Sequence, residues 1–255
     1  MTTTPSALRW PAAEQIDLGR APLTVLDRDR TQPFLLLHGG AGPHSVTGFG
    51  DLLAARLNTR VLMPTHPGFA GTDRPAGLAG IPALAALYAD LLDRLDVWDV
   101  TVAGNSIGGW VAAELALLGS PRVSGAVLIN AVGLEVPDHP ITDISGLSPA
   151  QVQALAWKDP GRVPPNPAQP GPDFAALAAY TGMTMSDPAL GDRLADLDLP
   201  VKVIWGAADG IAGPDYGRAY AAAIPGATFT LIEDAGHLPQ LEAPEELLAA
   251  VRAER

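Results

Sequence analysis

The pentapeptide Gly104-Asn-Ser-Ile-Gly108 is the feature that most constrains how this chain folds. It follows a short, β-branched run at residues 99–103 and precedes a long, helix-prone run at residues 109–118. This order predicts a strand, a sharp turn and a helix, with Ser106 raised above the end of the strand. Glycine on both sides has a steric reason, because a β-carbon there would keep strand and helix apart. The pattern indicates either a nucleophilic serine or a plain strand-to-helix turn of an α/β protein.

Apolar runs alternate with helix-prone segments along most of the chain. Runs that are apolar throughout are typical of strands buried on both faces of a sheet. Two shorter strands, near residues 16–18 and 23–26, are expected to form an antiparallel edge. The cadence of strand and helix predicts an α/β fold with a mainly parallel sheet covered by helices. Buried strands are expected at residues 34–38, 60–64, 99–103, 123–129, 201–205 and 228–232, and helices at about 49–57, 81–95, 109–118, 214–224 and 244–253.

Residues 134–199 interrupt this alternation. Ten prolines lie between residues 133 and 199, with short helix-prone pieces near 149–158, 173–182 and 188–197. The stretch is too long for a loop. We interpret residues 134–199 as a cap inserted into a core made of residues 1–133 and 200–255. Its large apolar side chains indicate either a roof over a substrate pocket or ordinary packing; they are Trp157, Phe174, Tyr180, Met183 and Met185.

Two polar side chains follow the last two predicted strands. Asp209 comes shortly after residues 201–205, and His237 comes shortly after residues 228–232. Because sites in open α/β sheets form at the carboxyl ends of the strands, both side chains are expected near Ser106. The order Ser106, Asp209, His237 predicts a catalytic triad of nucleophile, acid and base. Asp209 alone also fits a turn or a helix cap, and Glu135 or Asp138 offers an alternative acid after an earlier strand.

The segment His38-Gly39-Gly40 follows the strand expected beside the nucleophile strand. The backbone N–H groups of Gly40 and Ile107 are the predicted oxyanion hole, with Ala41 as the next choice. We interpret His38 as an organiser of this loop. The residues expected to contact the substrate are Gly39, Ala41, Asn105, Trp157, Met183 and Leu238.

Composition excludes several classes of partner. The formal net charge is −12, so nucleic acid and anionic membrane surfaces would be repelled. The chain has no cysteine, which excludes disulfides and thiolate chemistry and fits a reducing compartment.

His44, His66 and His139 have no spacing typical of a metal site. Neither a leader pattern nor an apolar stretch long enough to span a membrane is present, so we expect a cytoplasmic protein.

Five motifs together resemble the landmarks of the α/β-hydrolase superfamily. The resemblance implies an eight-stranded, mostly parallel sheet, a small-molecule substrate and no cofactor or metal. Serine at position 106, where haloalkane dehalogenases and related epoxide hydrolases carry aspartate, implies a serine hydrolase. The motifs are His38-Gly-Gly-Ala-Gly42, Pro67-Gly-Phe-Ala-Gly71, Gly104-Asn-Ser-Ile-Gly-Gly109, Gly206-Ala-Ala-Asp209 and Gly236-His-Leu-Pro-Gln-Leu-Glu-Ala-Pro-Glu245.

The expected activity is hydrolysis of a small apolar ester or lactone through an acyl-enzyme. Asn105 is similar to the residue found in hydrolases that cleave carbon–carbon bonds of ring-fission products, which is an alternative. Leu238 departs from that group, whose members commonly carry tryptophan there. Haloperoxidase-like or perhydrolase-like chemistry, and a ligand-binding protein of this fold with weak turnover, are further alternatives. Arg162 and Arg193 either meet a substrate carboxylate or are surface charges. The protein is expected to be a monomer or a homodimer.

Overall fold

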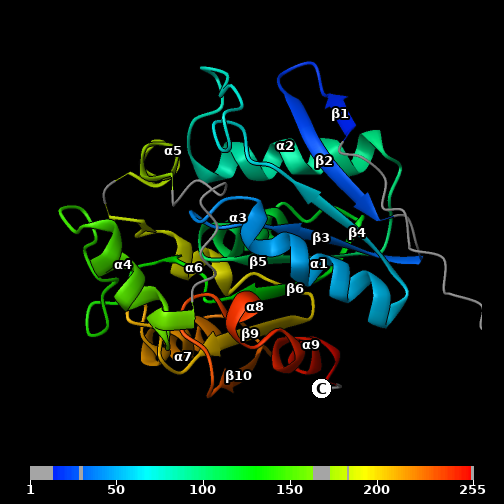
Figure 1. Cartoon of the computed structure of the whole chain (residues 1–255). Coiled ribbons are helices and arrows are strands. Elements are labelled where there is room, and N and C mark those ends of the chain that lie inside the picture. The colour runs from blue at the N-terminus through cyan, green and yellow to red at the C-terminus, as the bar shows by residue number, and fades with distance from the viewer. Residues whose placement is uncertain (1–13, 29–30, 163–172, 183, 254–255) are drawn as a thin grey trace, which may run out of the picture.

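The computed structural model describes residues 14–28, 31–162, 173–182 and 184–253. Within these ranges one eight-stranded sheet has the order β1-β2-β4-β3-β5-β6-β9-β10 (Figure 1). The strands from β4 to β10 in this order are parallel, and β1 and β2 form an antiparallel edge. The predicted fold class is therefore confirmed. The strands are β1 (Glu14–Asp17), β2 (Pro22–Arg28), β3 (Thr31–Leu37), β4 (Thr59–Pro64), β5 (Val100–Asn105), β6 (Val123–Ile129), β9 (Val201–Gly206) and β10 (Thr228–Ile232).

Helices cover both faces of the sheet. On one face lie α2 (Gly80–Arg94), α3 (Ile107–Leu117) and α7 (Pro214–Ala222), and on the other lie α1 (His44–Leu57) and α9 (Pro244–Arg252). Successive residues of a strand point to opposite faces, so Leu35 and Leu37 enter the first core and Leu36 enters the second. Because both faces are buried there, a central strand such as β3 is apolar throughout residues 34–37 rather than alternating.

The first helix begins earlier than the sequence predicts. It starts at His44 rather than near residue 49. The hydroxyl of Ser45 donates to the carbonyl of Gly42, and that of Thr47 donates to the carbonyl of Pro43. Polar residues in this first turn therefore stabilise it through local hydrogen bonds that an apolar periodicity does not reveal. The four-residue helix α8 (Pro239–Glu242), which packs on α1, was likewise not predicted.

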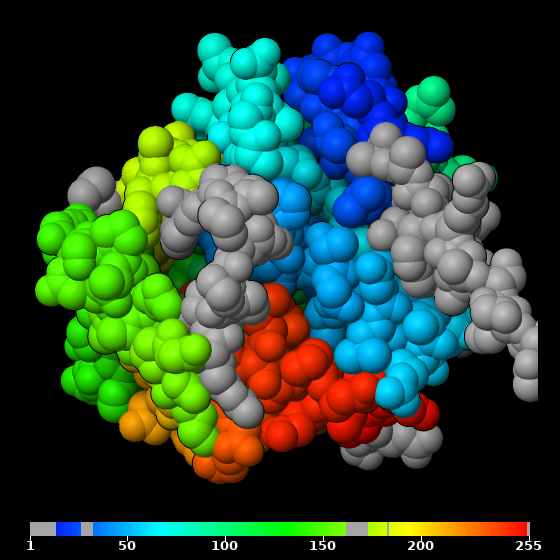
Figure 2. All heavy atoms as spheres, in the orientation of Figure 1, coloured from blue at the N-terminus to red at the C-terminus, as the bar shows by residue number. Residues whose placement is uncertain are grey.

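We call residues 134–199 the cap segment. Its described elements are α4 (Pro149–Ala156), the 3₁₀ turn η1 (Pro160–Arg162), α5 (Phe174–Thr181), β8 (Ser186–Asp187) and α6 (Leu190–Leu194). The short strand β8 pairs in parallel with β7 (Gly133–Leu134), which sequence periodicity did not predict. In Figure 2 the cap segment, coloured green to yellow, forms one side of the molecule beside the orange and red residues of the C-terminal part.

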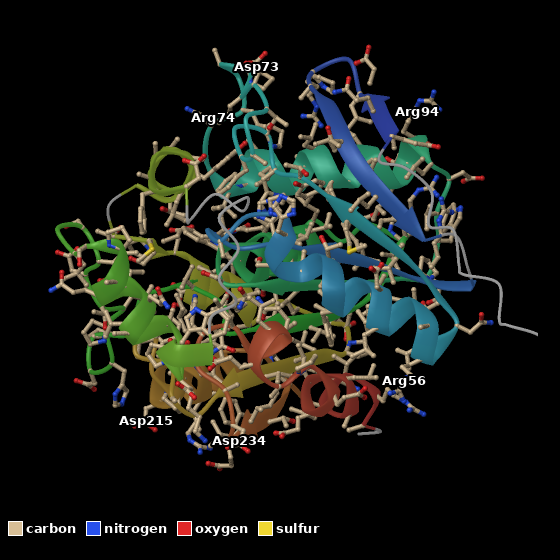
Figure 3. All side chains as sticks on the ribbon, in the orientation of Figure 1. Arg56, Asp73, Arg74, Arg94, Asp215 and Asp234 are labelled. Carbon is tan, nitrogen blue, oxygen red and sulfur yellow. The ribbon has the colours of Figure 1, made fainter. Side chains whose placement is uncertain are left out.

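Ion pairs join the cap segment to the core. Arg193 of α6 makes two bonds, of 2.6 and 2.7 Å, to the buried carboxylate of Glu114 in α3. It also contacts Asp187 at 2.7 Å. The guanidinium of Arg193 therefore binds carboxylates of the protein itself. This does not favour the alternative in which it meets a substrate carboxylate. Other charged side chains, such as Asp73 and Arg94, lie at the periphery (Figure 3).

None of the helices in the described ranges is both long and apolar enough to cross a bilayer.

Candidate active site

The turn between β5 and α3 holds Ser106 in a strained backbone conformation. Its φ is 57° and its ψ is −121°, values that a residue with a side chain rarely adopts. The Ser106 N–H donates to the carbonyl of Ile129 at 3.0 Å. An added Cβ at Gly108 would lie 2.4 Å from the carbonyl oxygen of Leu37, and one at Gly104 would lie 2.1 Å from that of Gly108. Glycine is therefore required on both sides of the serine for α3 to pack this closely on the sheet.

The loops after β9 and β10 bring Asp209 and His237 together. Nδ1 of His237 lies 2.8 Å from Oδ2 of Asp209, and both residues are buried, with 5% exposure each. Since the carboxylate accepts the Nδ1 proton, Nε2 is left as the acceptor of a neutral imidazole. The carboxylate that contacts His237 is that of Asp209, whereas the alternative acids Glu135 and Asp138 are exposed.

The carboxylate of Asp209 accepts three further hydrogen bonds. Oδ1 accepts from the N–H groups of Ile211 at 2.8 Å and Ala212 at 3.1 Å. Oδ2 also accepts from Nδ2 of Asn130 at 2.7 Å. Asn130 is buried at the end of β6, and its own oxygen accepts from the Gly206 N–H at 3.3 Å. These bonds fix the orientation of the acid relative to the histidine ring.

Asn105 connects the nucleophile strand to the histidine loop. Its Nδ2 donates to the carbonyl of His237 at 2.9 Å and to that of Ile129 at 3.2 Å. Its Oδ1 accepts from Nε2 of Gln240 at 3.1 Å, and its exposure is 1%. The residue before Ser106 thus contacts the backbone of His237 directly. Both Nδ2 protons therefore have protein partners, and the contact of Asn105 with a substrate, as expected from the sequence, stays a prediction.

The loop after β3 lies against the serine. An added Cβ at Gly39 would lie 2.8 Å from Cβ of Ser106, so this loop approaches Ser106 closely. Ile107 is the first residue of α3, where backbone N–H groups have no partner within the helix. In the part of the chain that the structure describes, neither the Ile107 N–H nor the Gly40 N–H donates a hydrogen bond. Both donors are thus available for an oxyanion.

Buried histidines hold that loop in place. Nδ1 of His38 lies 2.8 Å from the carbonyl of Gly39, and its Nε2 accepts from the His66 N–H at 3.0 Å. Nε2 of His66 donates to the carbonyl of His38 at 2.8 Å, while its Nδ1 accepts from the Tyr88 hydroxyl. Burial lowers the pKa of His38 to about 4 and lowers that of His66 well below its usual value. Both rings are therefore neutral near pH 7, and both nitrogens of each ring already have hydrogen-bond partners in the protein, which supports the interpretation of His38 as an organiser of the loop.

The cap segment contacts both the acid loop and the histidine loop. The carbonyl of Ala156, at the end of α4, accepts from the His237 N–H at 2.7 Å. The preceding carbonyl, of Leu155, accepts from the Gly210 N–H at 2.9 Å. Glu242 of α8 accepts from the N–H groups of Gly236 at 2.7 Å and Lys158 at 2.9 Å. Asn130 and Glu242 are the positioning residues that sequence reasoning missed.

The other predicted substrate contacts differ in exposure. Trp157 is half-buried after α4 and packs on a small apolar cluster, whereas Leu238 is buried at 7% exposure. Ala41 is half-buried beside Gly40. Met183 lies outside the described residues. The contact of these residues with a substrate stays a prediction. No group of three or more histidine, aspartate or glutamate side chains in the described ranges is arranged to hold a metal.

The sequence model of the alpha/beta hydrolase family matches residues 34–251. The chain belongs to this family. An uncharacterised protein of Mycobacterium tuberculosis is 27% identical to this hydrolase over 254 residues, covering 86% of this chain and 74% of the relative. The 2-hydroxymuconate semialdehyde hydrolase of Pseudomonas putida is 34% identical over 114 residues, covering 44% of this chain and 40% of that enzyme.

Solved structures have the same fold. A thermophilic esterase from Thermogutta terrifontis, with malate bound, superposes on this hydrolase with a TM-score of 0.76 and 25% identity. The match covers 94% of this chain and 97% of the esterase.

Proposed function

We propose that this hydrolase cleaves small, apolar carboxylic esters or lactones through an acyl-enzyme on Ser106. In this mechanism Nε2 of His237 takes the hydroxyl proton of Ser106 as the oxygen attacks the carbonyl carbon. The imidazolium returns the proton to the leaving alcohol, and the neutral ring then activates water. Asp209 holds the tautomer and stabilises the ring cation, and the N–H groups of Gly40 and Ile107 bind the oxyanion.

One observation carries the proposal. His237 lies 2.8 Å from the carboxylate of Asp209, and its backbone carbonyl accepts from Nδ2 of Asn105, the residue before Ser106. With Nδ1 donating to that carboxylate, Nε2 would be the acceptor for the proton of a serine nucleophile. The structural similarity to an esterase at 25% identity supports the choice of an ester substrate.

The test removes the hydroxyl and keeps the fold. We expect Ser106→Ala to lower kcat/KM for p-nitrophenyl butyrate by about 10⁴-fold or more, with an unchanged circular dichroism spectrum. Ser124→Ala, which truncates an exposed serine of β6, is the matched control and is expected to retain activity. A fluorophosphonate probe should label the wild type and the control, but not Ser106→Ala. Wild-type activity in Ser106→Ala would remove this serine from the mechanism, and absence of labelling in all three proteins would favour a ligand-binding protein.

A second candidate is hydrolysis of a carbon–carbon bond in a ring-fission dienoate. It is favoured by the 34% identity to the Pseudomonas putida hydrolase and by Asn105 before the nucleophile. Comparing kcat/KM for a vinylogous ring-fission acid with values for nitrophenyl esters separates the two. A preference of more than about tenfold for the dienoate would replace the first proposal with the second.

A further inference from the structure

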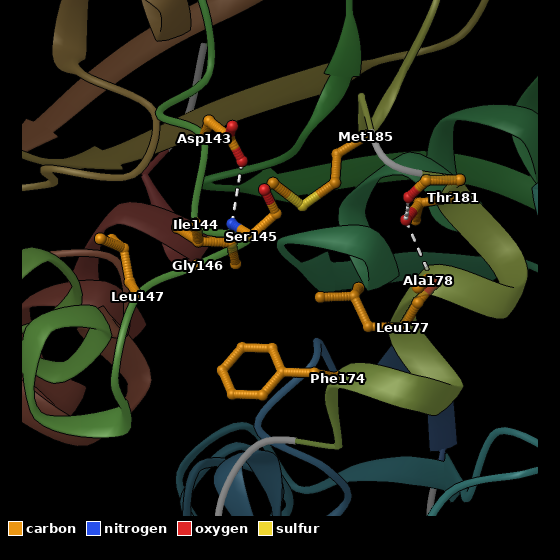
Figure 4. Close-up of a pocket in the computed structure, with 11 residues that line it drawn as sticks. Asp143, Ile144, Ser145, Gly146, Leu147, Phe174, Leu177, Ala178, Thr181 and Met185 are labelled. Atoms are coloured by element: carbon orange, nitrogen blue, oxygen red, sulfur yellow. Dashed lines mark hydrogen bonds between the residues drawn. The ribbon is translucent and has the colours of Figure 1, made fainter.

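A cavity in the cap segment lies next to the candidate oxyanion loop. It has a volume of about 430 Å³, within the range of small-molecule sites, and lies between residues 143–147 and α5 (Figure 4). Its walls are mainly apolar: Ile144, Leu147, Phe174, Leu177 and Met185. Of the large apolar side chains of the cap segment, Phe174 and Met185 line this cavity. Tyr180 is instead buried, and its hydroxyl donates to the carbonyl of Pro67.

Helix α5 joins this cavity to the reaction centre. An added Cβ at Gly40 would lie 3.4 Å from a methyl group of Leu177, a residue whose side chain lines the cavity. The N–H of Asp173, at the N-cap of α5, donates to the carbonyl of Gly40 at 3.1 Å. A substrate whose carbonyl oxygen is bound by the Gly40 N–H therefore has an apolar wall immediately beside it. An alkyl group extending from that carbonyl is expected to enter the cavity.

The charge at the cavity wall has one sign. Among the described residues that line the cavity, Asp143 is the single ionisable one, and an adjoining cavity of about 440 Å³ shares Asp143, Ser145 and Met185 and adds Glu135. Hydrogen bonds from Ser145, whose N–H lies 2.8 Å from Oδ1, lower the pKa of Asp143, so the group is anionic at neutral pH. No cation among the described residues lines either cavity.

Three cations, two of them in the cap segment, have other partners. Arg193 is paired with Glu114, and Lys158 is paired with Asp234. Arg74 lies over the ring of Tyr180, with 5.5 Å between its guanidinium carbon and the ring centroid. A carboxylate entering the cavity would therefore meet the negative charge of Asp143, an exposed residue of its wall, without a compensating cation among the described residues.

We propose that Asp143 makes this site selective for esters whose acyl chain ends in a neutral apolar or cationic group, and against esters whose chain ends in a carboxylate. This inference rests on the proposed ester hydrolysis at Ser106. A cationic end is favoured by the carboxylate of Asp143 and by the ring of Phe174, which line the same cavity. The same charge disfavours dienoate acids, so the inference also separates the two candidate functions.

The experiment uses three p-nitrophenyl esters with acyl chains of similar length: hexanoate, the monoester of adipic acid and 6-(trimethylammonio)hexanoate. Hydrolysis is compared for the wild type, Asp143→Asn and Asp138→Asn. Asp138 is the matched control, because it is an exposed carboxylate of the cap segment that lines neither cavity. Each result is expressed as the ratio of kcat/KM for a charged ester to kcat/KM for the neutral p-nitrophenyl hexanoate. This ratio cancels general effects on folding.

We expect Asp143→Asn to raise the anionic-to-neutral ratio by about three- to tenfold and to lower the cationic-to-neutral ratio by a similar factor, as for two charges in a partly hydrated site. Asp138→Asn should change neither ratio by more than about twofold. Equal effects of both variants, or no effect of either, would overturn the inference.

Binding distinguishes this inference from the proposed function. Calorimetric titration of the wild type with hexanamide, hexanoate and hexyltrimethylammonium needs no hydrolysis. If no ester is hydrolysed but hexanoate binds more weakly than the other two probes, and Asp143→Asn removes the difference, the proposed function fails and the charge preference stands. Equal binding of the three probes overturns the charge preference.

Discussion

Replacing His38 should reduce the loss of folding stability at acidic pH. The pKa of this buried ring is lowered from 6.5 to about 4 in the folded protein. As the pH falls below about 6.5, the unfolded chain binds a proton at His38 that the folded protein does not bind. The contribution of the neutral His38 ring to the free energy of unfolding is therefore complete above about pH 6.5 and is lost progressively down to about pH 4. A difference of 2.5 pKa units corresponds to about 3 kcal/mol, of which about 2 kcal/mol is lost between pH 7 and pH 5.

The assay is urea unfolding followed by tryptophan fluorescence at pH 7, 6 and 5. In His38→Gln, the side-chain oxygen can still accept from the His66 N–H, and no ring remains to be protonated. We expect its free energy of unfolding to fall by about 2 kcal/mol less than that of the wild type between pH 7 and pH 5. The control is His139→Gln, because this histidine is exposed and folding changes its surroundings little. If wild type and His38→Gln lose stability in parallel, the neutral, loop-organising role of His38 is refuted.

Two further substitutions test the geometry of the site. Asn130→Ala removes the 2.7 Å bond to Asp209, and we expect kcat to fall by about tenfold or more with little change in KM; a larger effect on KM than on kcat would contradict the positioning role. Gly108→Ala should lower the free energy of unfolding by at least about 2 kcal/mol, measured by urea unfolding, because the new Cβ would lie 2.4 Å from backbone oxygen. Gly48→Ala, with nothing within 4 Å of its Cβ, should instead raise it, by about 0.5–1 kcal/mol.

The core strands were predictable because their surroundings leave one solution. A run such as residues 34–37, apolar throughout, matches a strand with helices on both faces, and β3 contains it. The pair β7 and β8 was not predictable, since two residues per strand leave no periodicity. Helix α8 has four residues and begins with Pro239, so it too has no repeating pattern. Elements this short depend on tertiary contacts rather than on local preference.

The residues of the candidate site also include some that the sequence predicted and some that it did not. Asp209 and His237 were found from strand order, because each stands in the loop after a recognisable strand. Asn130 also stands directly after a strand, β6, but an asparagine there is equally typical of a turn. Its role depends on the position of Asp209, which is 79 residues away in the chain. The polar atoms of Asn105 were expected to face a substrate, and only the fold reveals that they bridge to the histidine loop.

The hydrogen bonds that the carbonyls of Leu155 and Ala156 accept from Gly210 and His237 restrict how this family member can be engineered. A chimera in which a foreign lid replaces residues 134–199 would lose these two carbonyl acceptors for the loops that carry Asp209 and His237. Graft boundaries that leave residues 149–158 in place avoid this loss. On the proposed function, such grafts would vary the substrate range through α5 and the 143–147 loop while the hydrogen bonds to the loops of Asp209 and His237 stay in place.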